Sequence, residues 1–385
     1  MVGRHAALPL ALSADSTQAF SHSAAALRKS YSARESTMVA FLCLTLSSLL
    51  ALATAGEVKN CHPQCRCEVE SYGLFDSFSL TKVDCSGVGP GTAPVPIPLD
   101  TSHLDLSDNS ISSITDSMLS GPGYTTLVSL DLSNNLISKV SPQAFSKLRY
   151  LETLDLSQNA LESLGDGCFS GLPLADVDLS DNRMQVFNLD LFTTRGQETP
   201  IAVDLSNNLL TAVSRNPQSH APFIKSLALA GNRLRMVPKL AGIPLQYLSL
   251  DGNLITSIEQ GAFEEMKDLV YLSLSGLTEL STIQPGSFRG LRNLQVLDLS
   301  NNPQLKGVSP VMFSGLTSLQ ELNLSKSVET PLPVTVFDHM PSIKSLTLGP
   351  NMHCWKTHKP GQFHRQIGQA KANDILTCDV AGIVL

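Results

Sequence analysis

Apolar and polar residues alternate in a short pattern that recurs along most of this chain. Each unit begins with an apolar, a polar and a second apolar residue, as in Leu104, Asp105 and Leu106. Most units then carry an asparagine three residues later. Eleven units, spaced 21 to 26 residues apart, start at Leu104, Leu130, Leu154, Val177, Val203, Leu227, Leu248, Leu272, Leu297, Leu322 and Leu346.

Eleven copies of the pattern L-x-L-x-x-N-x-L are the signature of leucine-rich repeats. Successive side chains of a strand point to opposite faces, so Leu104 and Leu106 should face a core while Asp105 faces solvent. Stacked units bury a continuous core that no single unit could bury alone. The sequence therefore predicts an α/β fold: a curved leucine-rich-repeat solenoid with short parallel strands on its concave face.

Two further side chains recur at fixed places in the units. The asparagine amide can satisfy buried backbone groups of neighbouring coils, and Leu277 and Ser327, which replace it, should be weak points. Phenylalanine recurs ahead of most strands and should form a packing spine on the outer side. The asparagines are Asn109, Asn135, Asn159, Asn182, Asn208, Asn232, Asn253, Asn302 and Asn351, and the phenylalanines are Phe145, Phe169, Phe192, Phe263, Phe288, Phe313 and Phe337.

Residues 1–55 lack the repeat. An apolar run from Phe41 to Leu52 ends in Ala53-Thr54-Ala55, which is typical of a secretory signal cleaved after Ala55. The long lead-in suggests that translation can begin at Met38. No other apolar stretch approaches bilayer length, so we expect a secreted chain without a membrane span. We expect an N-terminal cap over residues 56–100, the repeats over 101–352, and a C-terminal cap and tail over 353–385.

Cysteines flank the repeats on both sides. Cys65 and Cys67 are one residue apart, which does not suit zinc, and a redox C-x-x-C motif is absent. The open ends of a solenoid must be covered, so we interpret both groups as disulfide-stapled caps. Four cysteines allow three pairings, and the spacing does not choose among them. The groups are Cys61, Cys65, Cys67 and Cys85 before the repeats, and Cys354 and Cys378 after them.

Cys168 is left over. It fills the position before the spine residue Phe169. It is either a small buried residue of the core or half of an intermolecular disulfide.

The cysteine pattern C-x3-C-x-C ahead of such repeats, with a two-cysteine cap behind them, resembles the small leucine-rich proteoglycans of the extracellular matrix. The seventeen residues between Cys67 and Cys85 resemble an outlying member of that family, as do the stretches YGLFDSFSLTKVDCSG and AFSKLRYLETLDLS. This resemblance implies the disulfides Cys61–Cys67, Cys65–Cys85 and Cys354–Cys378. It also implies a secreted protein that binds bone morphogenetic proteins together with chordin, transforming growth factor β, and Frizzled receptors in competition with Wnt.

The concave sheet is the default binding surface of a solenoid. Its outward positions are acidic in five consecutive units, at Asp105, Asp131, Asp155, Asp178 and Asp204, and nearly neutral afterwards. Either this row attracts a basic partner, or it is a well-solvated strand sequence common in such repeats. Tyr247 and Tyr271 occupy equivalent positions and could form an aromatic contact at the edge of the acidic zone.

Asn323 begins an N-x-S sequon and also occupies an outward strand position. A glycan there would stand on the concave face, unless the flat sheet leaves the site unmodified. We favour modification.

The chain shows no sign of catalysis. Its histidines are scattered, and no nucleophile, base and orienting group converge, so we expect no enzyme activity, metal or cofactor. A net charge of −7 does not indicate a nucleic-acid-binding protein. The leading hypothesis is a binder of secreted signalling proteins, and the alternative is a structural matrix protein that binds collagen fibrils.

Overall fold

The computed structural model describes residues 60–72, 78–88, 95–194, 196, 198–307, 309–327, 334–349, 352–358, 374–380 and 383–384. The chain divides into two compact units, Met1–Glu57 and Val58–Leu385, and all described residues belong to the second. The predicted signal segment 1–55 and the alternative start at Met38 lie outside the described residues.

One sheet of 16 strands runs through the described part of the second unit. Strands β2 to β19 pair in parallel, while the β1–β2 pair and the pairs from β19 to β22 are antiparallel. Each repeat contributes one parallel strand, which confirms the predicted solenoid. In order, the strands are β1 (Arg66–Tyr72), β2 (Phe78–Asp84), β3 (Thr101–Asp105), β5 (Ser129–Asp131), β7 (Thr153–Asp155), β8 (Asp176–Asp178), β10 (Ile201–Asp204), β12 (Ile224–Ala228), β13 (Tyr247–Ser249), β15 (Tyr271–Ser273), β17 (Val296–Asp298), β18 (Glu321–Asn323), β19 (Ser345–Gly349), β20 (Met352–His358), β21 (Asp374–Val380) and β22 (Ile383–Val384).

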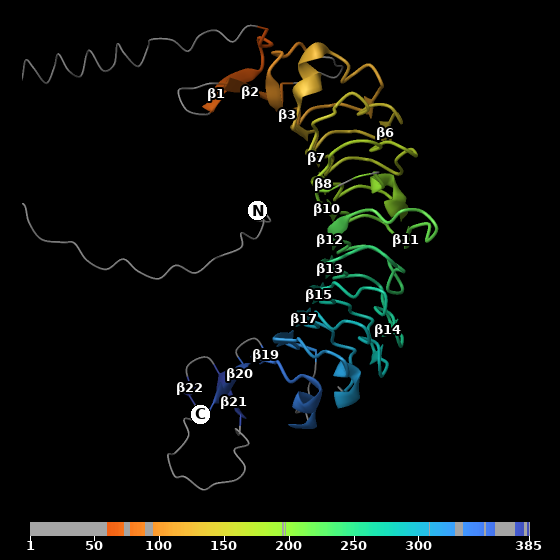
Figure 1. Ribbon diagram of the computed structural model, residues 1–385, viewed down its shortest axis with the longest axis vertical. Helices are drawn as coiled ribbons and strands as arrows, with labels where there is room; N and C mark the ends of the chain where they lie inside the picture. The colour runs from red at the N-terminus through yellow and green to blue at the C-terminus, as the bar shows by residue number, and fades with distance from the viewer. Residues whose placement is uncertain are drawn as a thin grey trace, which may run out of the picture. The chain divides into compact units, whose positions relative to one another are not determined.

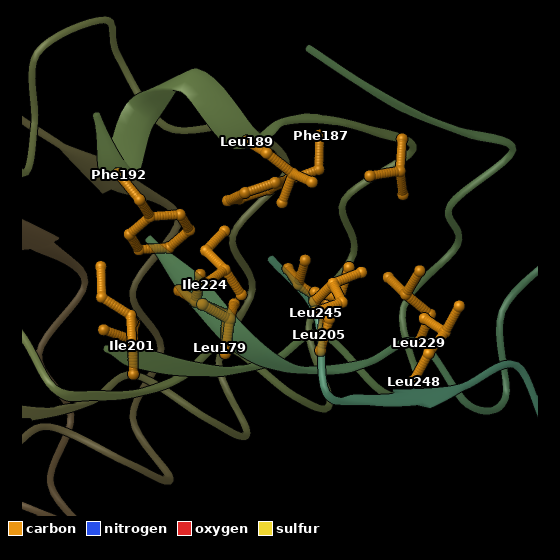
Figure 2. Close-up of a cluster of buried hydrophobic side chains, with 14 of the residues drawn as sticks. Leu179, Phe187, Leu189, Phe192, Ile201, Leu205, Ile224, Leu229, Leu245 and Leu248 are labelled. Atoms are coloured by element: carbon orange, nitrogen blue, oxygen red, sulfur yellow. The ribbon is translucent and has the colours of Figure 1, made fainter. Parts of the chain in front are cut away.

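The core lies between this sheet and the outer side of the coils. Leu104 and Leu106 are at most 1% exposed, whereas Asp105 between them is half-buried, as the alternation predicts. The repeats curve so that the main sheet lines the inner side of the arc and β6, β11 and β14 lie on the outer side (Figure 1). Figure 2 shows leucines and isoleucines from consecutive coils packed together in this core.

Short return segments build the outer side. Three two-stranded parallel sheets pair β4 (Ser113–Ile114) with β6 (Lys139–Val140), β9 (Val186–Asn188) with β11 (Ala212–Ser214), and β14 (Ser257–Ile258) with β16 (Thr282–Ile283). The helical segments of the described residues are 3₁₀ turns, namely η1 (Pro122–Thr126), η2 (Leu189–Phe192), η3 (Pro310–Phe313) and η4 (Val334–His339). The helical layer of an α/β fold is therefore reduced to single turns. Coils of 21 to 26 residues leave little room for longer helices.

The predicted asparagine ladder connects successive coils. The Asn135 amide group donates to Leu106 O at 2.9 Å in the preceding coil and to Leu132 O at 3.1 Å in its own coil. Its Oδ1 accepts from the Ile111 N–H at 3.0 Å. Each such side chain therefore satisfies backbone groups that the sheet leaves unpaired, and losing it should cost about 1–3 kcal/mol.

The two exceptions to the ladder behave differently. The Ser327 hydroxyl donates to Leu299 O and accepts from the Asn302 N–H at 2.9 Å, so a serine performs part of the asparagine's role. Leu277 is fully buried and has no polar side-chain group to offer. Of the two predicted weak points, only Leu277 removes both the donor and the acceptor of the asparagine, whereas Ser327 keeps part of its role.

The residue before the ladder asparagine has a left-handed backbone. Asp108 has φ of 57°, Gln158 of 54° and Gly231 of 66°. Asn, Asp and Gly tolerate this region better than other residues do. This backbone requirement explains why most units read DN, NN or GN at the turn.

The phenylalanine spine consists of two separate stacks. Phe145, Phe169 and Phe192 stack at centroid distances of 6.1 and 5.2 Å. A second stack joins Phe263, Phe288 and Phe313 at 5.9 and 6.5 Å. The coils between Phe192 and Phe263 supply no ring at this position.

Cys168 packs in the core beside the first stack. It is 3% exposed, and burial raises the pKa of its thiol to about 12. Both properties favour the interpretation as a small core residue over a disulfide with another chain.

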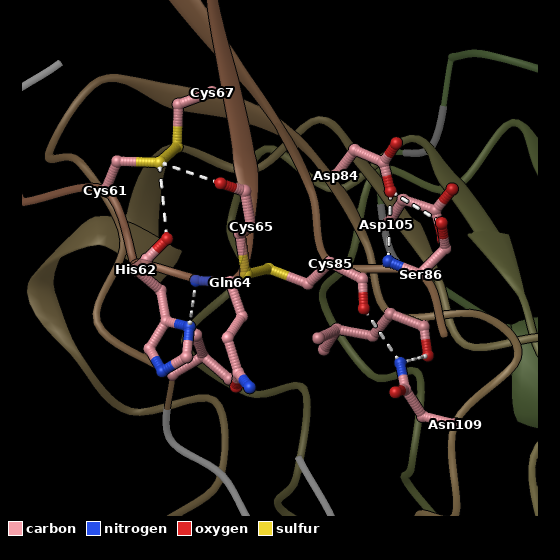
Figure 3. Close-up of a disulfide and its surroundings, with 12 residues drawn as sticks. Cys61, His62, Gln64, Cys65, Cys67, Asp84, Cys85, Ser86, Asp105 and Asn109 are labelled. Carbon is pink, nitrogen blue, oxygen red and sulfur yellow. Dashed lines mark hydrogen bonds between the residues drawn. A yellow bond between two sulfur atoms is a disulfide. The ribbon is translucent and has the colours of Figure 1, made fainter. Parts of the chain in front are cut away.

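Two disulfides fasten the N-terminal cap, and they join Cys61 to Cys67 and Cys65 to Cys85 (Figure 3). This is the pairing that the family resemblance implies. Cys85 is fully buried, and its carbonyl accepts from the Asn109 amide group at 2.9 Å. The disulfides thereby staple the cap itself, and the hydrogen bond from Asn109 joins it to the first coil.

At the other end, the backbone of β20 and β21 places residues 354 and 378 directly opposite each other. Opposed residues of an antiparallel pair have Cα atoms about 4.5–5.5 Å apart, which suits a disulfide. The side chains of both cysteines lie outside the described part of the chain, so Cys354–Cys378 stays a prediction.

Candidate binding surface on the parallel sheet

The acidic residues of the first repeats form one row across the sheet. The strand register pairs Asp105 with Asp131, Asp131 with Asp155, Asp155 with Asp178, and Asp178 with Asp204. Neighbouring strands are about 4.8 Å apart. The five aspartates predicted from the sequence therefore stand side by side on one face.

The row is longer than the sequence analysis predicted. Asp84 on β2 pairs with Asp105 and adds a sixth carboxylate at the cap end. The signal is present in the stretch Val83-Asp84-Cys85-Ser86, which repeats the LDLS pattern with a cysteine in the place of the second leucine. Asp176, on the neighbouring row of β8, adds another carboxylate to the same face.

Each aspartate of the row also stabilises its own coil. The Oδ1 atom accepts a hydrogen bond from the serine N–H two residues later, at 2.8 Å in all five predicted positions. This contact caps the turn that follows each strand. The aspartate of the LDLS pattern thus has a structural role as well as a charge.

The middle of the row is electrostatically unfavourable. The pKa of Asp155 is raised to about 6, mainly by burial and further by the charges of Asp178 and Asp131. The pKa values of Asp178 and Asp176 are also raised, again mainly by burial and further by neighbouring aspartates. At the cap end, hydrogen bonds from the Ser86 hydroxyl and N–H lower the pKa of Asp84. The negative charge is therefore most favourable at Asp84, at the cap end of the row. It is least favourable at Asp155 and Asp178, in the middle.

The acidic row stops at β12. Ala228 follows Asp204 in the register, and Ser249 and Ser273 come next, each 3% exposed. Asp251 takes over the capping role in this region, because its Oδ1 accepts from the Ser273 hydroxyl at 2.6 Å and the Ser275 N–H at 2.7 Å. The row positions from β12 to β15 therefore carry small, uncharged side chains.

Two tyrosines stand beside these small residues. Tyr247 and Tyr271 are direct neighbours in the register, and their rings stack at 4.8 Å with an interplanar angle of 13°. Burial raises the pKa of Tyr247 to about 12, helped by Tyr271, Asp251 and Asp204. Both hydroxyls are therefore neutral donors at neutral pH. The predicted aromatic pair is present at the end of the acidic row.

Asn323 lies on the same face in the C-terminal half. Its Oδ1 accepts from the Ser325 N–H at 3.1 Å, as the aspartates do, and its amide nitrogen donates to Asp298 Oδ2 at 3.2 Å. The side chain is half-buried between Asp298 and Thr347. Glycosylation would replace one hydrogen of the nitrogen that contacts Asp298.

Known proteins are similar to this chain over most of its length. A family model described as leucine rich repeat matches residues 125–184, 243–303 and 277–328. Tsukushi of Danio rerio is 72% identical over 348 residues, which cover 90% of this chain and 100% of that protein. The chain belongs to the Tsukushi family. Tsukushi of Gallus gallus is 56% identical over 334 residues, covering 86% of this chain and 90% of that protein. Tsukushi of Homo sapiens is 52% identical over 325 residues, covering 84% and 92%.

Membership in the Tsukushi family confirms the resemblance that the cysteine spacing indicated. It also fits a general role in binding other proteins, which the exposed sheet can serve. Among the residues that the structure describes, no helix is long and apolar enough to cross a membrane.

The cap end of the acidic row has its own recess in this Tsukushi-family chain. A cavity of about 350 Å³ lies between the β1–β2 hairpin and the first repeats. It is lined by Arg66, Glu68, Lys82, Asp84, His103, Asp105 and Asp131, among others. The carboxylates outnumber the cationic side chains. The recess therefore continues the acidic surface toward the cap.

Proposed function

We propose that this protein is a secreted, non-enzymatic binding protein that modulates extracellular growth-factor signalling. By family resemblance, its partners are bone morphogenetic protein with chordin, transforming growth factor β, and Frizzled receptors, where it competes with Wnt. The acidic row from Asp84 to Asp204 supports this proposal, because six aligned carboxylates on one open face attract a basic partner surface.

The tyrosine pair would add a buried aromatic contact to the electrostatic attraction of the acidic row. Tyrosine is enriched among residues that dominate binding energy, because a large ring with a polar end buries well. Tyr247 and Tyr271 stand where the acidic row ends, so a basic partner held by the row would meet them. In this proposal the aspartates set the association rate and orientation, and the rings slow dissociation.

Secretion is supported by the cysteines. Disulfides such as Cys61–Cys67 and Cys65–Cys85 persist in oxidising compartments. We expect cleavage after Ala55. N-terminal sequencing of the protein collected from the medium of expressing cells tests this step, and an intact N-terminus in a cell-associated protein would contradict it.

A surface-binding measurement tests the function. The purified secreted chain is passed over immobilised bone morphogenetic protein, with and without chordin, and over fibrillar collagen. We expect growth-factor binding that chordin strengthens and that weakens as salt rises, because exposed charges are screened. Binding to collagen alone would instead support a structural role in the matrix.

A further inference from the structure

A groove of about 360 Å³ opens on the outer side of the coils, away from the acidic row. One wall is the return segment that contains Met236, Val237 and Leu240, and the other is the segment from β14 to Met266. Strand β14 lies on the outer side of the arc (Figure 1). The apolar part of the lining consists of Met236, Val237, Leu240, Ala241, Ala262 and Met266.

The groove lies where the phenylalanine spine is interrupted. The unit that starts at Leu227 is the shortest, with 21 residues, and its return segment contains Pro238. Leu240 stands at the spine position, eight residues before the next strand motif, where the following unit has Phe263. A smaller side chain on a shorter segment leaves space against the adjacent coil.

Met236 makes this region apolar at a place where most units are polar. Its side chain is 70% exposed. The equivalent positions of the outer strands are Ser113 and Lys139 in one sheet, and Ser257 and Thr282 in another. In the preceding coils this position holds Val186, which is 62% exposed, and Ala212. A strip of exposed apolar residues thus leads to the groove, and such strips mark interaction sites.

The rim of the groove is acidic. Glu259, Glu264 and Glu265 line it, against the single cation Lys239. Glu259 accepts hydrogen bonds from the neutral groups of Ser257 and Gln284, which leave its charge in place. Glu264 faces Arg289 at 3.9 Å, but both side chains are more than half exposed, so this ion pair is weak.

We propose that this groove binds a short segment of a partner protein in which an apolar side chain is flanked by lysine or arginine. The apolar side chain would contact the exposed Met236, above a floor formed by the buried Leu240 and Met266, and the cations would contact the rim glutamates. The volume is at the small end for ligand sites, about 300–1,000 Å³, which fits a few side chains rather than a domain face. The inference does not depend on the proposed function of the concave sheet, and both surfaces can be occupied together.

The two groove methionines are local reporters. The disulfide-bonded full chain is labelled at the methionine methyl groups with carbon-13, and the signals of Met236 and Met266 are assigned by leucine substitution. The probe is a capped heptapeptide of alternating lysine and leucine. We expect saturable shifts of both signals, while Met184, which is fully buried elsewhere in the core, does not respond.

Matched peptides and variants decide the outcome. Glu264→Lys with Glu265→Lys should weaken peptide binding at least tenfold, and Met236→Ser should weaken it several-fold. Val311→Ser, at another exposed apolar site (45%), should have no effect. Equal binding of a glutamate–leucine peptide, or no shift at Met236, would overturn the proposal. A Met236 signal that changes with protein concentration alone would show a second copy in the groove and would also overturn it.

Discussion

The two halves of the concave sheet solve the same structural problem with different side chains. From β2 to β10 every row position is an aspartate that caps the next turn. From β12 to β15 the row holds Ala228, Ser249 and Ser273, and Asp251 provides the capping contact from outside the row. At β17 Asp298 again caps its turn, accepting from the Ser300 N–H at 2.8 Å, and at β18 the uncharged Asn323 does so through the same kind of bond.

This difference shows that the fold does not require a carboxylate at each row position. Asn323 demonstrates that an amide can accept the same hydrogen bond without a charge. Like charges directly opposite each other in a sheet are destabilising. Six aspartates in register are therefore more than folding needs, and a basic partner would relieve their repulsion.

The largest effect should come from reversing charge in the acidic half. Asp131→Lys with Asp155→Lys should weaken binding of a basic growth factor by about a hundredfold, or ~2.7 kcal/mol. Asp131→Asn with Asp155→Asn keeps the capping acceptor and should weaken binding about tenfold. Affinities of both variants are compared by surface binding at two salt concentrations, with Asp298→Asn as the control from the other half. Unchanged affinity of the lysine variant would move the site off the acidic half.

Variants of the tyrosine pair test whether the binding site extends past the end of the acidic row. Tyr247→Ala removes the stacked ring and should reduce growth-factor affinity by about 1–2 kcal/mol, as expected for a moderate hot spot. Tyr247→Phe keeps the stack and should retain most of the affinity. Dissociation rates from the same surface should show the difference between the two variants. If both bind like the parent, the rings serve the sheet and not the partner.

The ionisation of Asp155 should make the acidic half less stable at neutral pH. Its folded-state pKa of about 6 lies above its ordinary value of 3.8. The folded state therefore holds this proton more tightly, and the resulting stability is complete below pH 3.8 and lost as pH rises through 6. Asp155→Asn removes this titration and keeps the cap.

Thermal unfolding at pH 4 and pH 7 checks this sign. The midpoint of Asp155→Asn relative to the parent should be higher at pH 7 than at pH 4. A constant offset between Asp155→Asn and the parent at both pH values would contradict the raised pKa.

The smallest effect should come from the sequon in the other half. We expect Asn323 to carry a glycan, which peptide mass mapping with and without glycosidase would detect. Because the acidic half is the proposed site, Asn323→Gln should remove the glycan while changing growth-factor affinity less than twofold. A large gain in affinity would instead mean that the glycan covers the site.

The sequence predicted the repeating elements well because each is set by a local pattern. The leucines, the ladder asparagines and the aspartate positions all follow from periodicity and register. The aspartate caps were missed because they depend on turn geometry two residues downstream. Asp84 was missed because Cys85 interrupts the leucine pattern, and the outer groove because it arises from the packing of two coils of unequal length.

The interrupted spine also bears on how the molecule unfolds. In a solenoid each coil contacts only its neighbours, so stability is close to a sum of local and nearest-neighbour contributions. The rings that couple Phe145 to Phe192 and Phe263 to Phe313 give two strongly coupled blocks, and the coils without a ring couple them weakly. Cooperativity should therefore fail first at those coils, so that each block melts as a unit of its own.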